Sequence, residues 1–457
     1  MLSQAIVQDK SPDSAYALSA GEARRLIEDG LLTSQQLVEA CLERIDELEQ
    51  SIGAWTHLDR ELALEQARAA DAFRSRGLPT GALHGLPVGI KDIIDTSDFP
   101  TENGTVLHKA RTPSTDATLV SLLKEAGAII VGKTVTTELA VYSPGKTSNP
   151  YNIEHTPGGS SSGSAAAVAC AMVPLAVGTQ TNGSLIRPAS YCGVYAFKPS
   201  FARISRFGVL KQSSPLDTVG VFARNLEDLA LIADVLMRYD GQDSDMKPTA
   251  PPCINPVMEQ AVPAPPRFAF VRTAKWDQVE QSSKDGFREL IDAVNEKTSG
   301  SIDVVTLPTQ FDDLYDHHRT VMEADLAQSF AREYNDGKAK LSSVLVEMIE
   351  RGQKVSTAEY ASSIAKKNEY GDILKAIFED YDAILTPSTS GPAPQGLEST
   401  GSPAFSTIWT FCGNPAINLP ILQGPNDLPV GVQVVADRGD DARLFRTCRW
   451  LLELLND

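Results

Sequence analysis

The sequence predicts an α/β fold, and three observations indicate it. Residues 116–126 have the pattern of a helix, Gly127 ends that helix, and the apolar run AIIV at 128–131 indicates a buried strand. The small-residue stretch AAAVACAMVPLAVGT at 165–179 predicts a tightly packed helix followed by a strand. Later in the chain, the short apolar runs FAFV, IDVVTL and DAILTP predict further strands. Helices that alternate with buried strands are typical of an α/β sheet.

The first sixty residues are expected to be helical. Ser19 and Glu22 have the spacing of a capping box at the start of a helix, and apolar residues then recur on one face of a helix. Those apolar residues are Leu37, Cys41, Ile45 and Leu48. At LPVGIKDIID, residues 86–95, the pattern changes to short apolar runs bounded by glycine, which predicts a buried strand. Asp116 is expected to cap the helix that follows.

The second half of the chain is expected to extend the same sheet. Asn225 is placed to cap a helix over 226–238, and residues 239–266, rich in proline and polar residues, predict an exposed connection. A helix near 282–297 and polar helices up to about 380 separate the later strands. None of these segments carries enough apolar residues to enclose a separate core. We therefore expect one domain over 1–457, with N-terminal helices at 1–65, a catalytic core at 80–235, and the remaining strands and substrate-side helices at 267–457.

Composition limits the classes of function. The chain has 457 residues, of which 42% are apolar and 22% charged, as in ordinary globular proteins. Its 41 Lys and Arg against 59 Asp and Glu give a net charge of −18, which repels nucleic acid and anionic membranes. The start, MLSQAIVQDKSPDS, lacks the features of a signal peptide, and no window approaches the ~20 apolar residues of a membrane span. We expect a soluble cytoplasmic protein with neither a nucleic-acid nor a membrane partner.

The cysteines indicate reduced thiols. They lie far apart with no C-x-x-C pair, so neither a zinc site nor a disulfide framework is predicted. No other pattern indicates a metal cluster, and we expect no metal and no organic cofactor. The cysteines are Cys41, Cys170, Cys192, Cys253, Cys412 and Cys448.

Two short motifs match known functional patterns, but the residues in or around them do not fit the local structure that those patterns require. GAIIVGKT, residues 127–134, fits the phosphate-loop pattern, but its central residues form an apolar strand pattern rather than a loop. Gly159-Ser160-Ser161-Ser162-Gly163 fits the nucleophile elbow G-x-S-x-G, with Ser161 as nucleophile and His317 or His318 as its base. An elbow follows a strand directly, whereas this one follows Glu-His-Thr-Pro-Gly, and proline interrupts strand pairing.

A third pattern combines three segments. These are GIKDIID with Lys91, TPGGSSSGSA with Ser160, and GTQTNGSLIRPASYCGVYAFKPS with Ser184, in which the two serines stand 24 positions apart. With these blocks in this order, the chain resembles the amidase signature family, and the resemblance extends through NPAINLPI and LPVGVQVVA near the C-terminus. It implies a single α/β domain with a mixed twisted β-sheet covered by helices on both faces.

The resemblance also implies a catalytic triad of Lys91, Ser160 and Ser184. Lys91 would act as a neutral amine, Ser160 would follow a cis peptide bond and relay a proton, and Ser184 would attack the carbonyl to form an acyl-enzyme. Lysine titrates near pH 10.4 in water, so it serves as a base at neutral pH only where burial disfavours its charge, and the apolar segment GLPVGIKDII predicts burial. From this segment alone, an ion pair of Lys91 with Asp92 or Asp95 is the alternative. For TPGGSSSGSA the alternative is a flexible loop.

The segment before Ser184 is expected to form the oxyanion hole. Backbone N–H groups of Thr181, Asn182, Gly183 and Ser184 would bind the oxyanion of the tetrahedral intermediate. The family usually has glycine where this chain has Asn182, and if the position requires a positive φ, Asn is among the residues that tolerate it.

Three further residues are candidates for substrate binding. Arg187 stands three positions after Ser184, as in the bacterial malonamidase branch that the chain resembles, where the matching arginine binds a substrate carboxylate. Arginine suits such bidentate recognition, and a structural ion pair is the alternative. Gln180 and Tyr142 lie near the motifs and are expected to shape the pocket.

The expected function is hydrolysis of a C–N bond in a small amide or carbamate, a urethanase-like activity, with esters as further substrates. Two alternatives remain open: the amidase subunit of an aminoacyl-tRNA amidotransferase, and a non-catalytic binding protein on an amidase scaffold. A homodimer is also left open.

Overall fold

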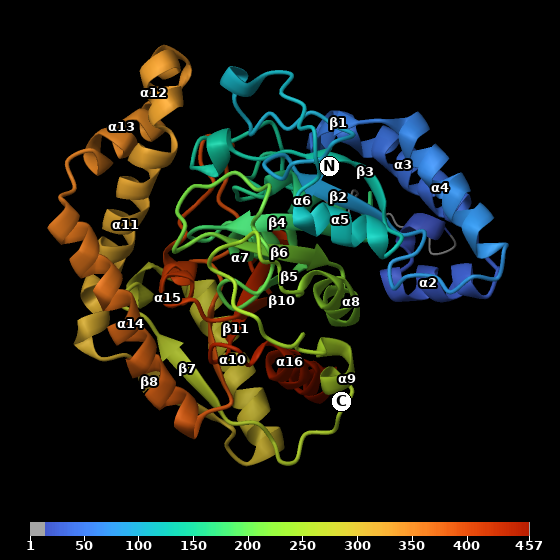
Figure 1. Ribbon diagram of the computed structural model, residues 1–457. Helices are drawn as coiled ribbons and strands as arrows, with labels where there is room; N and C mark the ends of the chain where they lie inside the picture. The colour runs from blue at the N-terminus through green and yellow to red at the C-terminus, as the bar shows by residue number, and fades with distance from the viewer. Residues whose placement is uncertain (1–13, 457) are drawn as a thin grey trace.

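The computed structural model describes residues 14–456, and its centre is one eleven-stranded sheet (Figure 1). The strand order is β1-β3-β2-β4-β6-β5-β10-β11-β9-β7-β8. The strands are β1 (Trp55–Leu58), β2 (Pro87–Lys91), β3 (Ile129–Thr134), β4 (Leu175–Gln180), β5 (Tyr195–Lys198), β6 (Thr218–Ala223), β7 (Phe268–Arg272), β8 (Ile302–Thr306), β9 (Ala383–Pro387), β10 (Ala416–Gln423) and β11 (Pro429–Val435). The predicted late strands therefore extend the same sheet.

The sheet is mixed. Strand β2 runs parallel to both neighbours, β3 and β4, and β7 runs parallel to β8 and β9. The other adjacent pairs are antiparallel. The expected fold class, a single α/β domain with a mixed sheet, is confirmed.

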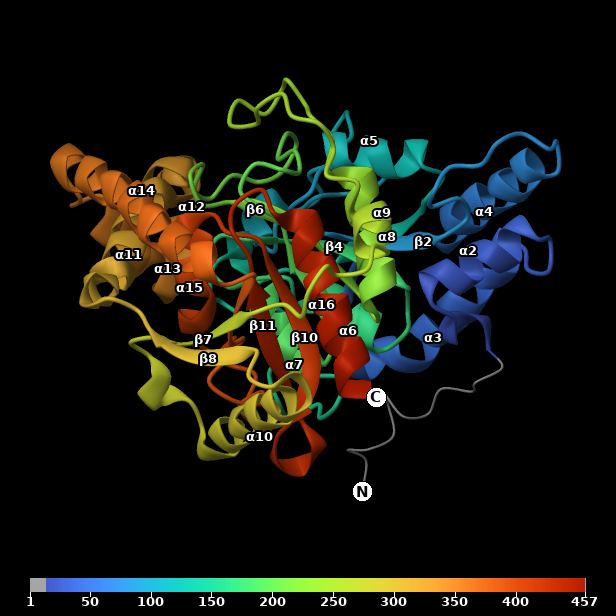
Figure 2. The same cartoon turned by 90° about the horizontal axis from the view of Figure 1, so that it is seen from below.

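Helices cover both faces of this sheet. In β4, Leu175 and Val177 pack in one apolar cluster with residues of α5 (Thr118–Glu125), α8 (Leu226–Leu236) and α16 (Asp441–Asn456). Ala176, between them, packs in a second cluster with residues of α6 (Ser162–Ala169). Buried residues on both faces are typical of a sheet between two helical layers. Figures 1 and 2 show α11–α14 (residues 314–380) gathered at one side of the molecule and α2–α4 (residues 20–74) at the opposite side.

The helices begin and end close to the predicted positions in most cases. Ser19 forms the capping box of α2, and Asn225 caps α8, which ends at Leu236, two residues earlier than expected. The helices are α2 (Ala20–Glu28), α3 (Ser34–Ile52), α4 (Arg60–Arg74), α5 (Thr118–Glu125), α6 (Ser162–Ala169), α7 (Ile186–Cys192), α8 (Leu226–Leu236), α9 (Ile254–Met258), α10 (Gln281–Thr298), α11 (Leu314–Ser329), α12 (Ala331–Gly337), α13 (Ser343–Gly352), α14 (Thr357–Asp380), α15 (Ala404–Cys412) and α16 (Asp441–Asn456).

Three local expectations need correction. Strand β1 lies inside the N-terminal region that was expected to be helical, where Trp55 pairs with Thr134 of β3. Asp116 does not cap α5, because its carboxylate accepts hydrogen bonds from the Ser97 backbone N–H at 2.7 Å and from Lys124 at 2.7 Å. The connection at 239–266 contains α9, in which Ile254 and Met258 are buried.

Two further properties concern the described residues. No helix within 14–456 combines the length and apolar character that crossing a membrane requires. All six cysteines are free thiols.

Candidate active site

Lys91 and Ser160 are in direct contact at the carboxyl end of β2. Lys91 is the last residue of β2, its side chain is fully buried, and Nζ is hydrogen-bonded to Ser160 Oγ at 2.7 Å and to Thr179 Oγ1 at 2.8 Å. Thr179 lies near the end of β4, which is parallel to β2. The carboxyl ends of adjacent parallel strands meet at one edge, where α/β sheets commonly place their sites.

Lys91 does not pair with the acidic residues that follow it. The Asp92 carboxylate lies 3.8 Å from Lys133, and Asp95 forms two hydrogen bonds with Arg111 at 2.7 and 2.9 Å. The ion-pair alternative for Lys91 is therefore wrong.

Burial changes the protonation of Lys91. Desolvation lowers the pKa of Lys91 well below its usual value, and the charge of Arg187 lowers it further, whereas the Asp217 carboxylate raises it in part. The neutral amine is the form that accepts a proton, so burial favours the form that a general base requires.

The segment TPGGSSSGSA is a rigid part of the core. All residues from 156 to 165 are buried, and 162–165 already belong to α6. The peptide bond between Gly159 and Ser160 is cis, as the resemblance implies. A Cβ atom at Gly163 would lie 2.2 Å from the Ala54 carbonyl oxygen, so only glycine fits there. The flexible-loop alternative is wrong.

Neither the phosphate-loop motif at 127–134 nor the nucleophile-elbow motif at 159–163 forms the site that its pattern predicts. Lys133 lies within β3 and donates to the Ile94 carbonyl at 2.7 Å and to Thr101 Oγ1 at 2.6 Å, so residues 127–134 form no phosphate loop. Ser161 Oγ donates to the Thr179 carbonyl at 3.1 Å, whereas His318 bonds the Thr181 carbonyl at 3.1 Å. No Ser161–His pair exists among the described residues.

Ser184 lies between β4 and α7 with an available hydroxyl. It is 8% exposed, and among residues 14–456 its hydroxyl makes no hydrogen bond, to Ser160 or to any other group. The backbone N–H groups of Asn182, Gly183 and Ser184 also donate to no group in the described part of the chain. Three successive free N–H groups beside a free hydroxyl are the arrangement that an oxyanion hole needs.

Asn182 is held by its side chain rather than by an unusual backbone. It is not among the residues with positive φ, so the condition on its backbone does not apply. Its Nδ2 donates to the Tyr142 hydroxyl at 3.1 Å, and its Oδ1 accepts from Thr407 Oγ1 at 2.7 Å. Tyr142 and Asn182 are thus joined, as expected of residues that shape one pocket.

Gln180 connects the site to α7. Its Oε1 accepts from the backbone N–H groups of Leu185 at 2.8 Å and Ile186 at 3.0 Å, and its Nε2 donates to Thr410 at 2.9 Å. These bonds occupy both ends of the Gln180 side-chain amide. They link residue 180 to residues 185 and 186 and so hold the loop that carries Ser184.

Arg187 is buried without an acidic partner. It is 1% exposed, Nη2 donates to the Gly159 carbonyl at 2.6 Å, and Nη1 donates to the Gly401 carbonyl at 2.8 Å. Within 14–456 it forms no ion pair, and its Nε has no hydrogen-bond partner. The ion-pair alternative is wrong, and the guanidinium instead holds the residue that precedes Ser160.

Two residues near the site, Asp217 and His318, have no recognisable sequence signal. Thr181 Oγ1 lies 2.6 Å from Asp217 Oδ1, and burial raises the pKa of Asp217 to about 6. His318 donates to the Thr181 carbonyl, and burial lowers its pKa to about 4. Tertiary packing alone brings these residues to the serine segments.

Comparison with known proteins decides the family. The amidase family model matches residues 36–445. The chain belongs to the amidase family. This amidase is 32% identical to a subunit of the glutamyl-tRNA(Gln) amidotransferase of Natranaerobius thermophilus, over 96% of both chains.

Solved structures give the same result for the fold. One is described as a vestigial protein complex that reveals the origins of an s-triazine catabolic enzyme; it is 26% identical, covers 95% of this chain and 98% of its own, and has a TM-score of 0.88. The peptide amidase of Stenotrophomonas maltophilia is 25% identical over 96% of both chains, with a TM-score of 0.82.

A cavity of about 360 Å³ lies beside Asn182, two residues before Ser184. Asn182 and Tyr142 line it, together with residues of α11, α13 and the start of α15. Pro403, another lining residue, would lie 2.9 Å from a Cβ at Gly183, which places the cavity wall against the residue before Ser184.

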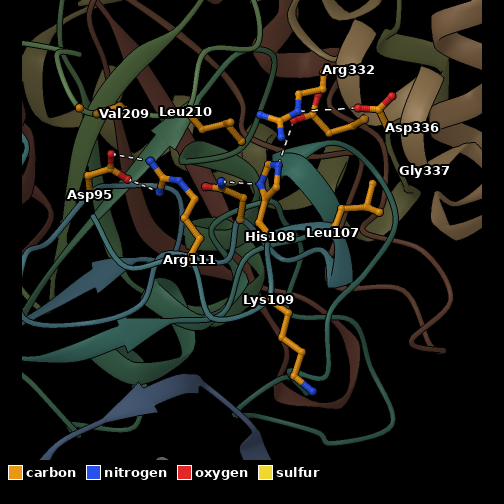
Figure 3. Close-up of a pocket in the computed structure, with 13 residues that line it drawn as sticks. Asp95, Leu107, His108, Lys109, Arg111, Val209, Leu210, Arg332, Asp336 and Gly337 are labelled. Atoms are coloured by element: carbon orange, nitrogen blue, oxygen red, sulfur yellow. Dashed lines mark hydrogen bonds and ion pairs between the residues drawn. The ribbon is translucent and has the colours of Figure 1, made fainter. Parts of the chain in front are cut away.

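A larger, polar cavity of about 560 Å³ lies elsewhere, between the 95–111 segment, the 208–210 loop and α12 (Figure 3). His108 bridges Asn103 and Glu333 there, at 2.9 Å each, and Arg111 is paired with Asp95. None of the expected triad residues lines either cavity, but Asn182 of the expected oxyanion hole lines the smaller one. We therefore place the candidate active site at the Lys91–Ser160 contact.

Proposed function

We propose that this amidase hydrolyses the C–N bond of a small amide through Lys91, Ser160 and Ser184. The observation that carries the proposal is the 2.7 Å hydrogen bond between the buried Lys91 amine and Ser160. A serine hydroxyl is a poor nucleophile without an adjacent base, and burial makes this lysine a suitable one.

The reaction proceeds in two halves. Neutral Lys91 accepts the Ser160 proton while Ser160 accepts the Ser184 proton, and Ser184 Oγ forms a bond to the substrate carbonyl carbon. A rotation of the free Ser184 hydroxyl toward Ser160 completes the relay. The N–H groups of residues 182–184 stabilise the oxyanion, the C–N bond breaks, and the proton returns to the leaving amine. Water then attacks the acyl-enzyme by the same relay and releases the acid.

Two substitutions test the triad. Ser184→Ala should abolish turnover of a simple amide, and Lys91→Ala should lower kcat by at least ~10³-fold, because neither leaves an activated nucleophile. Ser162→Ala is the matched control, since within residues 14–456 its Oγ makes a single hydrogen bond, to the Val135 carbonyl at 3.4 Å. Mass detection of a fluorophosphonate on Ser184 provides a readout independent of substrate choice. Wild-type rates in either triad variant would exclude the mechanism.

The range of substrates is a finer part of the proposal. An acyl-enzyme route also accommodates carbamates and esters, which differ in the leaving group and the acyl substituent. A screen of amides, carbamates and p-nitrophenyl esters on wild type and Ser184→Ala tests this, because all three activities should depend on Ser184.

We also propose a narrower version of this function, in which Arg187 binds a carboxylate of the substrate, as the resemblance to the malonamidase branch implies. It is a buried cation with no acidic partner in the described residues, and its Nε is unoccupied. A substrate carboxylate would neutralise it. Malonamate should then be cleaved faster than malonamide, and Arg187→Lys should remove that preference while Ser184 remains open to labelling.

A role within an amidotransferase complex is the second candidate, favoured by the similarity to a glutamyl-tRNA(Gln) amidotransferase subunit. Copurification with partner subunits, together with amide turnover that requires them, would support this role. Turnover of simple amides by the isolated chain favours the hydrolase.

A further inference from the structure

The wall of the cavity beside Asn182 is mostly apolar. Its volume of about 360 Å³ lies in the range of small-molecule sites, and an apolar cavity of about 150 Å³ is enough to bind benzene. Its apolar lining consists of Tyr142, Tyr315, Met322, Val344, Met348, Pro403 and Ala404. Methionine and tyrosine side chains pack well against aromatic and aliphatic groups.

The charged residues of the wall are already paired. Glu323 accepts hydrogen bonds from Arg351 Nε at 3.1 Å and Nη2 at 2.6 Å, and Arg319 pairs with Asp316 at 2.8 Å. His318 is committed to the Thr181 carbonyl, and burial lowers its pKa to about 4, so it is neutral at pH 7. The cavity therefore offers no free charge to a carboxylate or an ammonium group.

The position of the cavity connects it to the chemistry. Asn182 lines it, donates to Tyr142 and stands two residues before Ser184. A substrate whose carbonyl oxygen reaches the N–H groups of residues 182–184 would extend one end past Asn182.

We infer that this cavity binds an uncharged apolar group of the substrate, an aliphatic chain of four to six carbons or one aromatic ring. The inference rests on the proposed hydrolase function and opposes the form of it in which Arg187 binds an acidic substrate, because it makes apolar monoamides better substrates than small or acidic ones. The half-buried Val344, on α13, faces the occupant and limits its size.

Two series of amides test the inference. In one, the acyl group grows from acetyl to hexanoyl and phenylacetyl on a constant amine; in the other, the amine grows on a constant acetyl group. One series should show a rise in kcat/KM of at least tenfold, since each buried methylene adds to transition-state binding. A flat response in both series, or a preference for malonamate over hexanoamide, would overturn the inference.

A filled cavity provides the matched test. Val344→Trp should remove the preference for the large group, lowering kcat/KM at least tenfold more for the large compound than for the acetyl compound, whereas Val346→Trp, on the same helix but outside the cavity lining, should keep the preference. An equal loss for small and large substrates in Val344→Trp would contradict the assignment. Failure of the proposed function would differ, because fluorophosphonate would then not label Ser184 and even acetyl compounds would not be cleaved.

Discussion

The titratable residues Lys91 and Asp217 lie close enough for the charge of Asp217 to shift the pKa of Lys91. Burial lowers the pKa of Lys91, while the charge of the Asp217 carboxylate raises it in part. Asp217 also accepts the backbone N–H groups of Gln212 at 2.9 Å and Ser213 at 3.0 Å, so its position is fixed. Asp217 therefore raises the pKa of Lys91 through its charge, without a hydrogen bond to the amine.

Asp217→Asn should move the acid limb of kcat/KM to lower pH. Lys91 must lose its proton to act, and the variant removes a negative charge that favours the protonated amine, so the pKa of Lys91 falls further. The measurement is a pH profile from 5 to 10. Asp245→Asn, an acid paired with Arg206 at the surface, is the control and should leave the limb in place. A shift to higher pH in Asp217→Asn would contradict the coupling.

His318 should make the fold sensitive to acid. Burial lowers its pKa from 6.5 to about 4, so the folded state binds this proton less readily than the unfolded state. The stability is fully present above pH 6.5 and is lost as the pH falls through 4, by about 3 kcal/mol at most from the size of that shift. Urea unfolding between pH 4 and 7 measures it. His318→Gln, whose amide can still donate to Thr181, should flatten this dependence; an unchanged slope would exclude His318 as its source.

The sequence allows prediction of only part of the site at this scale. The resemblance placed Lys91 with Ser160, and the structure has them in contact. Asp217 and His318 lie 36 and 137 positions from Thr181, and nothing in local spacing indicates that they meet. The Ser160–Ser184 contact stays a prediction.

Among the elements, α6 depends on small residues that let it approach the sheet. The helix contains Gly163 and a run of alanines, all buried, and it packs against β2, β3 and β4. Its N-terminal end follows Ser160 directly, so its position fixes the serine that contacts Lys91.

Gly163→Ala should destabilise the protein by roughly 1–3 kcal/mol, because the added Cβ would overpack the space beside the Ala54 carbonyl and the Val135 backbone N–H, at 2.2 and 2.3 Å. Denaturant unfolding measures the change. Gly286→Ala in α10 is the matched control, since its nearest neighbour would lie at 3.6 Å, and it should stabilise by about 0.5–1 kcal/mol. Equal effects of the two substitutions would contradict the packing argument.

Periodicity predicted the long elements well and the short ones poorly. The amphipathic pattern of α3 and the capping of α8 are local properties, so their residues alone indicate them. The four residues of β1 become a strand only because β3 offers an edge to pair with. Asp116 has the residue type of a cap, but the Ser97 segment and Lys124 compete for its carboxylate.

For the whole molecule, the single sheet explains why distant segments can form one site. Residues 91, 160, 179 and 184 come from three separate motifs, and β2 and β4 lie side by side at the point where these meet. Residues of α11, α13 and the start of α15 add most of the wall of the cavity beside Asn182. The three motifs thus contain the proposed catalytic residues, while the second half of the chain supplies most of the cavity beside them.

The net charge of −18 should keep the isolated chain from binding tRNA. Binding to a phosphate backbone requires clustered Lys and Arg that release counterions, and here acidic residues outnumber basic ones by 59 to 41. A filter-binding titration at 150 mM salt should give a Kd weaker than about 100 μM, the weak end of non-specific binding, and tRNA should not change amide turnover. The titration repeated at 50 mM salt is the control, since a hidden basic surface would bind far more tightly there. Saturable low-micromolar binding with a steep salt dependence would instead favour the amidotransferase role.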